Sequence, residues 1–321
     1  MCIAVFIWQA DSRYSLVLLL NRDEYHNRPT KAVHWWEGGD QIVGGKDEVG
    51  GGTWLASSPN GKLAFLTNVL ELHTNPQAKT RGDLPVRFLQ STKSPMEFAK
   101  ELVNEGNEYN GFNLILADIE TKKMVYITNR PKGEPMAIQE VQPGIHVLSN
   151  AKLDSPWPKA QKLKLNFKKM LEVYRVNDEN ICVREMIEKL MRDTTRAEKS
   201  KLPRICSTDW ELRLSSIFVQ VDTHLCIHTG ATGLGQYGIS SKKFQSHSTS
   251  SPTLSNAINS DSIVERAIQV CLDDFQETAP PPIVKTYPLM DFTSFDPVIQ
   301  FASPYTSSTA RYPKTLFIAI Q

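Results

Sequence analysis

Blocks of apolar residues separated by short polar segments run through the first 70 residues. Residues 2–10 and 16–21 are rich in Val, Ile, Leu and Phe, and a polar segment at 11–15 joins them. Two such runs predict a β-hairpin, and their nearly continuous hydrophobicity predicts burial on both faces. Residues 53–56 and 62–68 flank an Asn-Gly turn at 60–61, which predicts a second hairpin.

Apolar residues return at helical spacing between 84 and 103, and further strand-like and helix-like segments alternate after them. The expected strands are 112–117, 124–128, 145–149, and a pair at 216–221 and 225–227; the expected helices are 158–174 and 183–191. Hairpins, then helices, then strands, then helices are typical of sheets covered by helices. We therefore expect an α+β layered domain.

The composition changes near residue 230. Residues 240–262 are rich in Ser and Thr, and proline becomes frequent further on. We expect a domain over 1–230 and a poorly ordered Ser/Thr/Pro-rich tail over 231–321, with one helix at 263–275 and one terminal strand at 316–320.

Charge and cysteine content narrow the class of protein. The formal net charge of the 321 residues is +1, which gives no electrostatic reason to expect nucleic acid as a partner. The five cysteines are scattered without a Cys-x-x-Cys pair, which favours a reducing, cytoplasmic compartment over a disulfide framework. His224 and His228 lie in a strand-like stretch, so their spacing predicts no metal site. No window is apolar for long enough to predict a transmembrane segment.

The thiol at position 2 is the first candidate for chemistry. If Met1 is removed, Cys2 carries both a thiol and an α-amine, and the amine can serve as the base for its own thiol. The alternative is that Cys2 is a small apolar residue at the start of a buried strand.

A polar tetrad, Asn21-Arg22-Asp23-Glu24, ends the second apolar run. In an antiparallel hairpin this end lies opposite the start of the first strand, so Arg22 and Asp23 come near Cys2 unless the register slips. The arginine would then lower the pKa of the thiol, and the aspartate would orient the α-ammonium. The alternative is a solvated turn.

An ordered set of short motifs accompanies these residues and resembles the NRDE family. The motifs are Met1-Cys2, Asn21-Arg22-Asp23-Glu24, Gly51-Gly52-Thr53-Trp54, Leu66-Thr67-Asn68, Tyr109-Asn110-Gly111-Phe112-Asn113-Leu114, Leu148-Ser149-Asn150-Ala151 and Pro156-Trp157-Pro158-Lys159. The resemblance covers residues 1–222 and weakens after Val221.

The family is similar to the N-terminal nucleophile hydrolases, which implies a four-layer αββα sandwich. By position, Cys2 resembles the nucleophile, and Arg22 and Asp23 resemble the residues that flank it. Asn68 and Asn150 resemble amide donors to an oxyanion, a role that is worth about 100- to 1000-fold in rate where it operates. For both Asn residues, ordinary strand-end turn chemistry is the alternative.

Three functions remain open on the sequence. The resemblance to eukaryotic family members implies a small-molecule carrier for haem or for acyl-CoA and lipids, acting in secretion and Golgi organisation or at mitochondria. We favour this reading, although no Cys-x-x-Cys-His or clustered histidine marks a haem site. No cofactor is required for it. The second is a hydrolase of linear amides or thioesters with Cys2 as nucleophile, and the third is a scaffold whose tail contacts protein partners.

Overall fold

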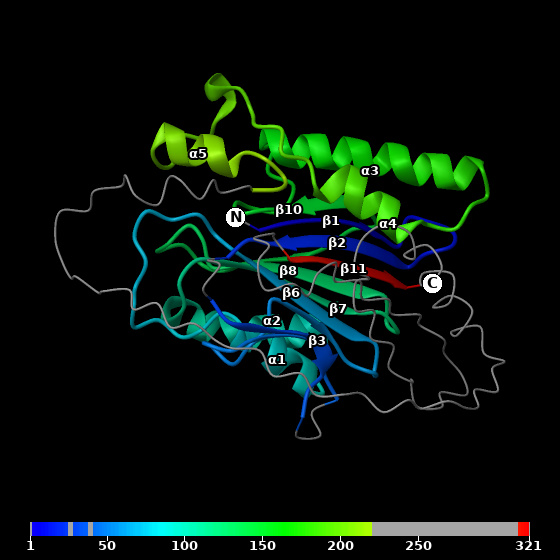
Figure 1. Cartoon of the computed structure of the whole chain (residues 1–321). Coiled ribbons are helices and arrows are strands. Elements are labelled where there is room, and N and C mark those ends of the chain that lie inside the picture. The colour runs from blue at the N-terminus through cyan, green and yellow to red at the C-terminus, as the bar shows by residue number, and fades with distance from the viewer. Residues whose placement is uncertain (1, 25–27, 38–40, 220–313, 321) are drawn as a thin grey trace, which may run out of the picture. The chain divides into compact units, whose positions relative to one another are not determined.

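A computed structural model describes residues 2–24, 28–37, 41–219 and 314–320, and the described residues fall within one compact unit (Figure 1). Two antiparallel sheets form its centre. The first has four strands in the order β10-β1-β2-β11. Their bounds are Gly144–Leu148 (β10), Ile3–Trp8 (β1), Leu16–Arg22 (β2) and Lys314–Ile320 (β11).

The second sheet has seven strands in the order β3-β4-β5-β6-β7-β8-β9. Their bounds are Thr30–Trp35 (β3), Val43–Asp47 (β4), Leu55–Ser57 (β5), Lys62–Asn68 (β6), Phe112–Asp118 (β7), Lys123–Thr128 (β8) and Ala137–Glu140 (β9). Strands β6 and β7 pair over seven residues and are almost entirely buried, because both faces of this part of the sheet are covered.

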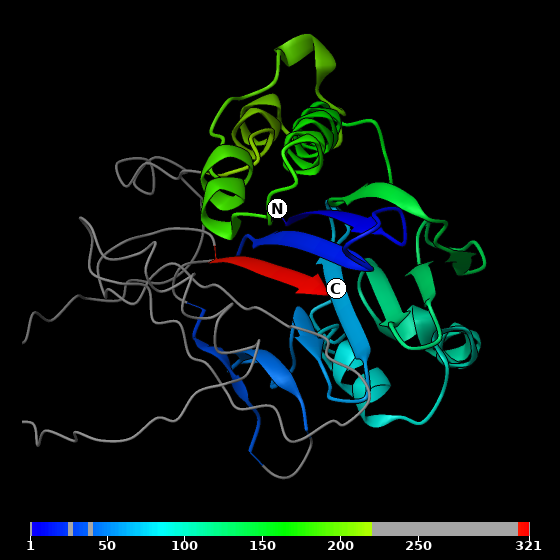
Figure 2. The same ribbon diagram turned by 90° about the vertical axis from the view of Figure 1, so that its right-hand side faces the viewer.

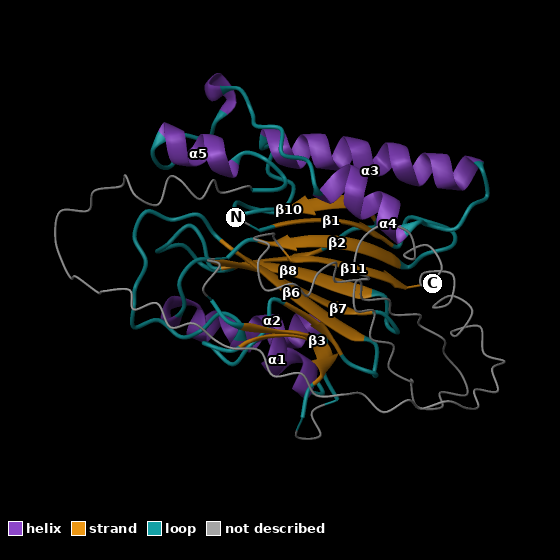
Figure 3. Cartoon of the chain, viewed as in Figure 1, coloured by secondary structure: helices purple, strands orange, loops and turns teal. Residues whose placement is uncertain are grey.

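Helices cover the outer face of each sheet (Figure 3). The second sheet packs against α1 (Asp83–Gln90) and α2 (Pro95–Leu102), and α2 begins with a capping box between Ser94 and Glu97. The first sheet packs against α3 (Pro158–Val176) and α4 (Val183–Met186), which continues as a π-turn over Ile187–Met191. Helix α5 (Thr208–Leu214) follows on the same side (Figure 1).

Three separate apolar clusters correspond to the three interfaces between these layers. Alternate residues of β1 point to opposite faces: Phe6 packs on Phe65 of the second sheet with ring centroids 5.7 Å apart, while Val5 packs with the α3 side chains. Figure 2 shows β1, β2 and β11 (blue and red) between the α3 layer and the second sheet. The layers confirm the predicted α+β αββα sandwich.

Most of the predicted elements are confirmed, including the terminal strand, which lies within the range predicted as a tail. Three strands and one α-helix of the described residues were missed: β3, β4, β9 and α5. The predicted strand at 216–221 is wrong where it is described. Phe218 N–H donates to the carbonyl of Asp193, and the Ser216 hydroxyl donates to the Phe218 carbonyl, so the backbone of Phe218 is hydrogen-bonded in a bend and not in a strand pair.

Some predictions fall outside the described residues. These are the strand at 225–227, the helix at 263–275, the domain boundary at 230 and the order of most of the tail.

Candidate functional site

Cys2 precedes β1 and lies between the ends of two neighbouring strands. The register pairs Ile3 with Asn21 of β2 and Ala4 with Leu148 of β10. Cys2 Sγ is therefore 3.9 Å from the Asp23 carbonyl oxygen, and the Ser149 hydroxyl donates a 3.0 Å hydrogen bond to the Cys2 carbonyl. The predicted register is confirmed, because the end of β2 does lie beside Cys2.

Burial governs the chemistry of this thiol. Cys2 is 7% exposed, and burial raises the pKa of its thiol, although nearby positive charge opposes the shift. Burial likewise raises the pKa of Asp23. In the chain that retains Met1, burial therefore disfavours the thiolate of Cys2.

Arg22 is held mainly by groups other than the thiol. Its Nη2 is 2.9 Å from Asp47 Oδ2, and its guanidinium lies 4.4 Å from the centre of the Trp54 ring. Asp47 also binds Arg28 through contacts of 2.5 and 3.0 Å. Burial raises the pKa of Asp47, but the hydrogen bonds from Arg28 and Gly50 and the charges of Arg28 and Arg22 together outweigh it, and the net pKa is lowered. The charge of Arg22 still acts on Cys2, and the sequence analysis missed Asp47 and Arg28 as its partners.

Asn68 and Asn150 meet where the two sheets approach each other. Asn150 Nδ2 donates to the Asn68 backbone carbonyl at 2.6 Å, and the Asn150 carbonyl accepts from Leu70 N at 2.9 Å. One amide proton of Asn150 thus joins the end of β10 to the end of β6. The structure brings the two residues together, and their role as oxyanion donors stays a prediction.

Asn113, which the sequence analysis did not single out, supports this junction. It is fully buried inside β7 and donates to the Ala151 carbonyl at 2.9 Å and to the Thr67 hydroxyl at 3.2 Å. Tyr126 donates to its Oδ1 at 2.8 Å, and burial raises the pKa of that tyrosine to about 12. The sequence signal that could have identified Asn113 is its position as a polar residue within an otherwise apolar strand.

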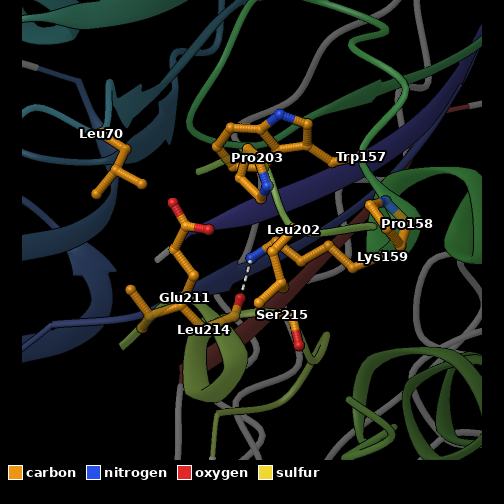
Figure 4. Close-up of a pocket in the computed structure, with 9 residues that line it drawn as sticks. All are labelled: Leu70, Trp157, Pro158, Lys159, Leu202, Pro203, Glu211, Leu214 and Ser215. Atoms are coloured by element: carbon orange, nitrogen blue, oxygen red, sulfur yellow. Dashed lines mark hydrogen bonds between the residues drawn. The ribbon is translucent and has the colours of Figure 1, made fainter. Parts of the chain in front are cut away.

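A small pocket of about 20 Å³ lies where α3 begins, next to α5 (Figure 4). Its lining comprises Leu70, Trp157, Pro158, Lys159, Leu202, Pro203, Glu211, Leu214 and Ser215. Burial lowers the pKa of Lys159 to about 8, and electrostatic interactions with Asp23 and Cys2 oppose this shift.

Glu211 is the second ionisable group of the pocket. Its carboxylate accepts hydrogen bonds from the backbone N–H groups of Arg204, Ile205 and Cys206. Burial raises the pKa of Glu211, but these three donors outweigh it and the net pKa is lowered. Glu211 is therefore a charged side chain whose oxygens are already occupied.

Within residues 2–24, 28–37, 41–219 and 314–320, no group of three or more His, Cys, Asp or Glu could hold a metal ion. In the same part of the chain, no helix has the length and hydrophobicity to cross a membrane.

The sequence also matches a known protein family. The sequence profile of the Transport and Golgi organisation 2 family matches residues 1–267. The chain belongs to this family. The match confirms the resemblance found in the motifs and extends it beyond residue 222, where the motifs ended.

Two curated relatives carry the name of this family. The Mus musculus Transport and Golgi organization 2 homolog is 37% identical over 213 residues, which are 63% of this chain and 74% of the relative. The Bos taurus homolog is 36% identical over 253 residues, covering 70% of this chain and 91% of the relative.

Two solved structures are more distantly similar. A Caenorhabditis elegans N-acylethanolamine-hydrolyzing acid amidase ortholog has 14% identity and a TM-score of 0.41, covering 67% of this chain and 98% of that protein. A mutant conjugated bile acid hydrolase from Clostridium perfringens has 11% identity and a TM-score of 0.31, covering 52% of this chain and 57% of that protein. Likeness at this level carries no argument about activity.

Proposed function

We propose that this family member is a small-molecule carrier for an acyl-CoA or a related lipid, which enters at the small pocket at the start of α3 and widens it on binding. The observation that supports this proposal is the apolar wall of the pocket, which is formed by Leu70, Trp157, Leu202, Pro203 and Leu214. Ligand sites are mostly apolar with a few placed polar groups, and Lys159 and Glu211 are such groups here. The names of the curated relatives, which refer to transport, agree with a carrier role.

The pocket favours an acyl chain over haem. Its volume of about 20 Å³ holds about one water molecule, so an acyl chain has to displace the lining side chains to enter. Haem iron in proteins is held by His, Cys, Met or Tyr, and none of these residue types lines the pocket. Haem is therefore the alternative ligand.

Filling the pocket tests the proposal. Leu70 is half-buried on the pocket wall, so Leu70→Trp should occupy the space and weaken palmitoyl-CoA binding about tenfold or more, measured by titration calorimetry of the full chain. Leu72→Trp is the matched control, because Leu72 is 66% exposed two residues further on. Saturable haem binding without palmitoyl-CoA binding would replace the lipid by haem, and binding of neither would end the proposal.

A Cys2 amidohydrolase is the second candidate, favoured by the position of the thiol 3.9 Å from the Asp23 carbonyl oxygen. Two features weigh against it. Burial raises the pKa of the thiol in the chain that retains Met1, and one proton of the Asn150 amide is donated to the Asn68 backbone carbonyl. We expect no acylated Cys2 in intact-mass spectra after incubation with N-acyl amides and acyl thioesters. An adduct that turns over and is lost in Cys2→Ala would make hydrolysis the function.

A further inference from the structure

Asn21 is a polar side chain buried between the first sheet and the helices that cover it. It is fully buried near the end of β2, and the register pairs it with Ile3 of β1. Alternate residues of a strand share a face, and Val17 and Leu19 belong to the cluster beneath the helices. Asn21 therefore faces the helical layer, where a buried amide requires hydrogen-bond partners.

The side chain of Asn21 bonds to two backbone carbonyls from segments far along the chain. Its Nδ2 donates to the Met191 carbonyl at 2.8 Å and to the Ile217 carbonyl at 3.2 Å. Met191 ends the π-turn, which packs against β2 (Figure 1), and carbonyls at a helix end have no N–H partner inside the helix. Ile217 lies in the bend after α5. One amide thus joins the end of β2 to segments 170 and 196 residues away.

The opposite face of this strand end is held by the second sheet. Arg22 is the next residue, and its guanidinium is held by Asp47 and the Trp54 ring. Asp23 follows, and its carbonyl oxygen is 3.9 Å from Cys2 Sγ. The position of this carbonyl relative to the thiol therefore depends on how firmly the end of β2 is held on its two faces.

We propose that Asn21 is a positioning residue that fixes the end of β2 beneath the helical layer and thereby sets the position and burial of the Cys2 thiol. It acts through Asp23, whose backbone lies between the two. The inference concerns the thiol region and does not depend on the carrier function or on any ligand.

The hydrogen-bond donors of Asn21, and not its volume, produce this effect. Leucine at this position fills a similar space but leaves two buried carbonyls without a donor, which is costly. Aspartate keeps the shape of the side chain, but its ionised carboxylate has no donor and would face two carbonyl oxygens. Both Asn21→Leu and Asn21→Asp should therefore loosen the strand end.

The first test measures how fast iodoacetamide alkylates Cys2 in the full chain, by mass spectrometry of the N-terminal peptide. Asn21→Leu and Asn21→Asp should raise the rate about tenfold or more, because local opening at the strand end becomes more frequent. Val17→Ala is the matched control, since Val17 is fully buried on the same face of β2 and the change removes only methyl groups. It should change the rate by about threefold or less.

The second test separates positioning from a general loss of stability. The carbon-13 chemical shift of the Cys2 Cβ, followed against pH, gives the pKa of the thiol in the folded state. Burial raises this pKa in the chain that retains Met1, so loosening the strand end should lower it toward about 8.5, the value of a free thiol. Val17→Ala should leave it unchanged. Intact mass shows whether Met1 is retained, and variants are compared in the same state.

Each outcome decides the inference. If both Asn21 variants match Val17→Ala in alkylation rate and in thiol pKa, Asn21 only stabilises the core and the inference is overturned. Should neither Asn21 variant fold, the unmodified chain decides in urea below its unfolding transition. Cys2 must become reactive at the urea concentration at which the Asn21 side-chain amide begins to exchange its protons. A reactive Cys2 with a protected Asn21 amide overturns the assignment.

Discussion

At the scale of single residues, Lys159 places an ammonium on the buried side of an amphipathic helix. It precedes Leu163 by four residues and Phe167 by eight, and both are fully buried, so it lies on the apolar stripe of α3. The helix itself is predictable from this stripe. Lys159 also belongs to the motif Pro156-Trp157-Pro158-Lys159. Its hydrogen-bond partner, the carbonyl of Leu214, lies 55 residues away and could not be predicted from that motif.

The buried lysine predicts a pH dependence of stability. Its pKa is about 8 when folded and near 10.4 in an unfolded chain, so the unfolded state binds more protons between these values and the penalty of burying the charge fades as the pH rises. Lys159→Met lacks this penalty at every pH. The difference in unfolding free energy between Lys159→Met and the unmodified chain should therefore shift by about 2 kcal/mol in favour of the unmodified chain from pH 7 to 9.5. Urea denaturation at both pH values measures it, with Lys168→Met as control; a constant difference would contradict the titration of Lys159.

The predicted proximity of Cys2 to Arg22 and Asp23 followed from hairpin geometry, which is local and fixed by a short turn. The partners of the Arg22 guanidinium could not be predicted from the hairpin geometry. Asp47 lies 25 residues further on in the other sheet, and Trp54 lies just before β5. Sequence spacing carries no information about such contacts, because they arise only when the two sheets pack.

At the scale of elements, apolar continuity decided which strands could be predicted. Strands β1, β2, β6, β7 and β8 are buried almost throughout and appear as apolar runs. Strand β9 is mostly exposed, and β4 contains Gly44 and Gly45. A Cβ on Gly45 would come within 2.5 Å of the Trp54 ring, so this glycine is required by a neighbour that the local pattern does not reveal.

Strand β11 protects the edge of the first sheet. It pairs with β2 from Lys314↔Arg22 to Ile320↔Leu16. A chain ending at residue 313 should expose the backbone of β2, lower the melting temperature by roughly 5 °C or more and aggregate more readily, as measured by calorimetry and light scattering. A chain lacking only Gln321 is the control. Equal melting temperatures for the two chains would show that β11 contributes little to stability.

At the scale of the whole molecule, the packing of the two sheets against each other positions the candidate site. Cys2 belongs to the first sheet, Asn68 ends a strand of the second, and Asn150 joins the two. The site geometry thus depends on the cluster between the sheets, in which Phe6 and Phe65 meet edge to face.

Removing this contact should loosen the whole sandwich. Phe6→Ala deletes a fully buried aromatic ring and should lower the free energy of unfolding by about 3–5 kcal/mol. Leu165→Ala, on the exposed face of α3 at 54% exposure, should change it by about 0.5 kcal/mol or less. Chemical denaturation measures both. Similar values for the two variants would contradict the inter-sheet core as the main source of stability.

The sequence by itself determined the buried strands, the principal helices, the layered class and the position of Cys2 beside the end of β2. These depend on the periodicity of apolar residues and on short turns, which are local properties of the chain. Only the tertiary structure decided that the Arg22 guanidinium pairs with Asp47, that Asn150 donates to Asn68, and that Lys159 and Glu211 share an apolar pocket. Those contacts join residues far apart in the chain, and they exist only once the sheets and helices pack together.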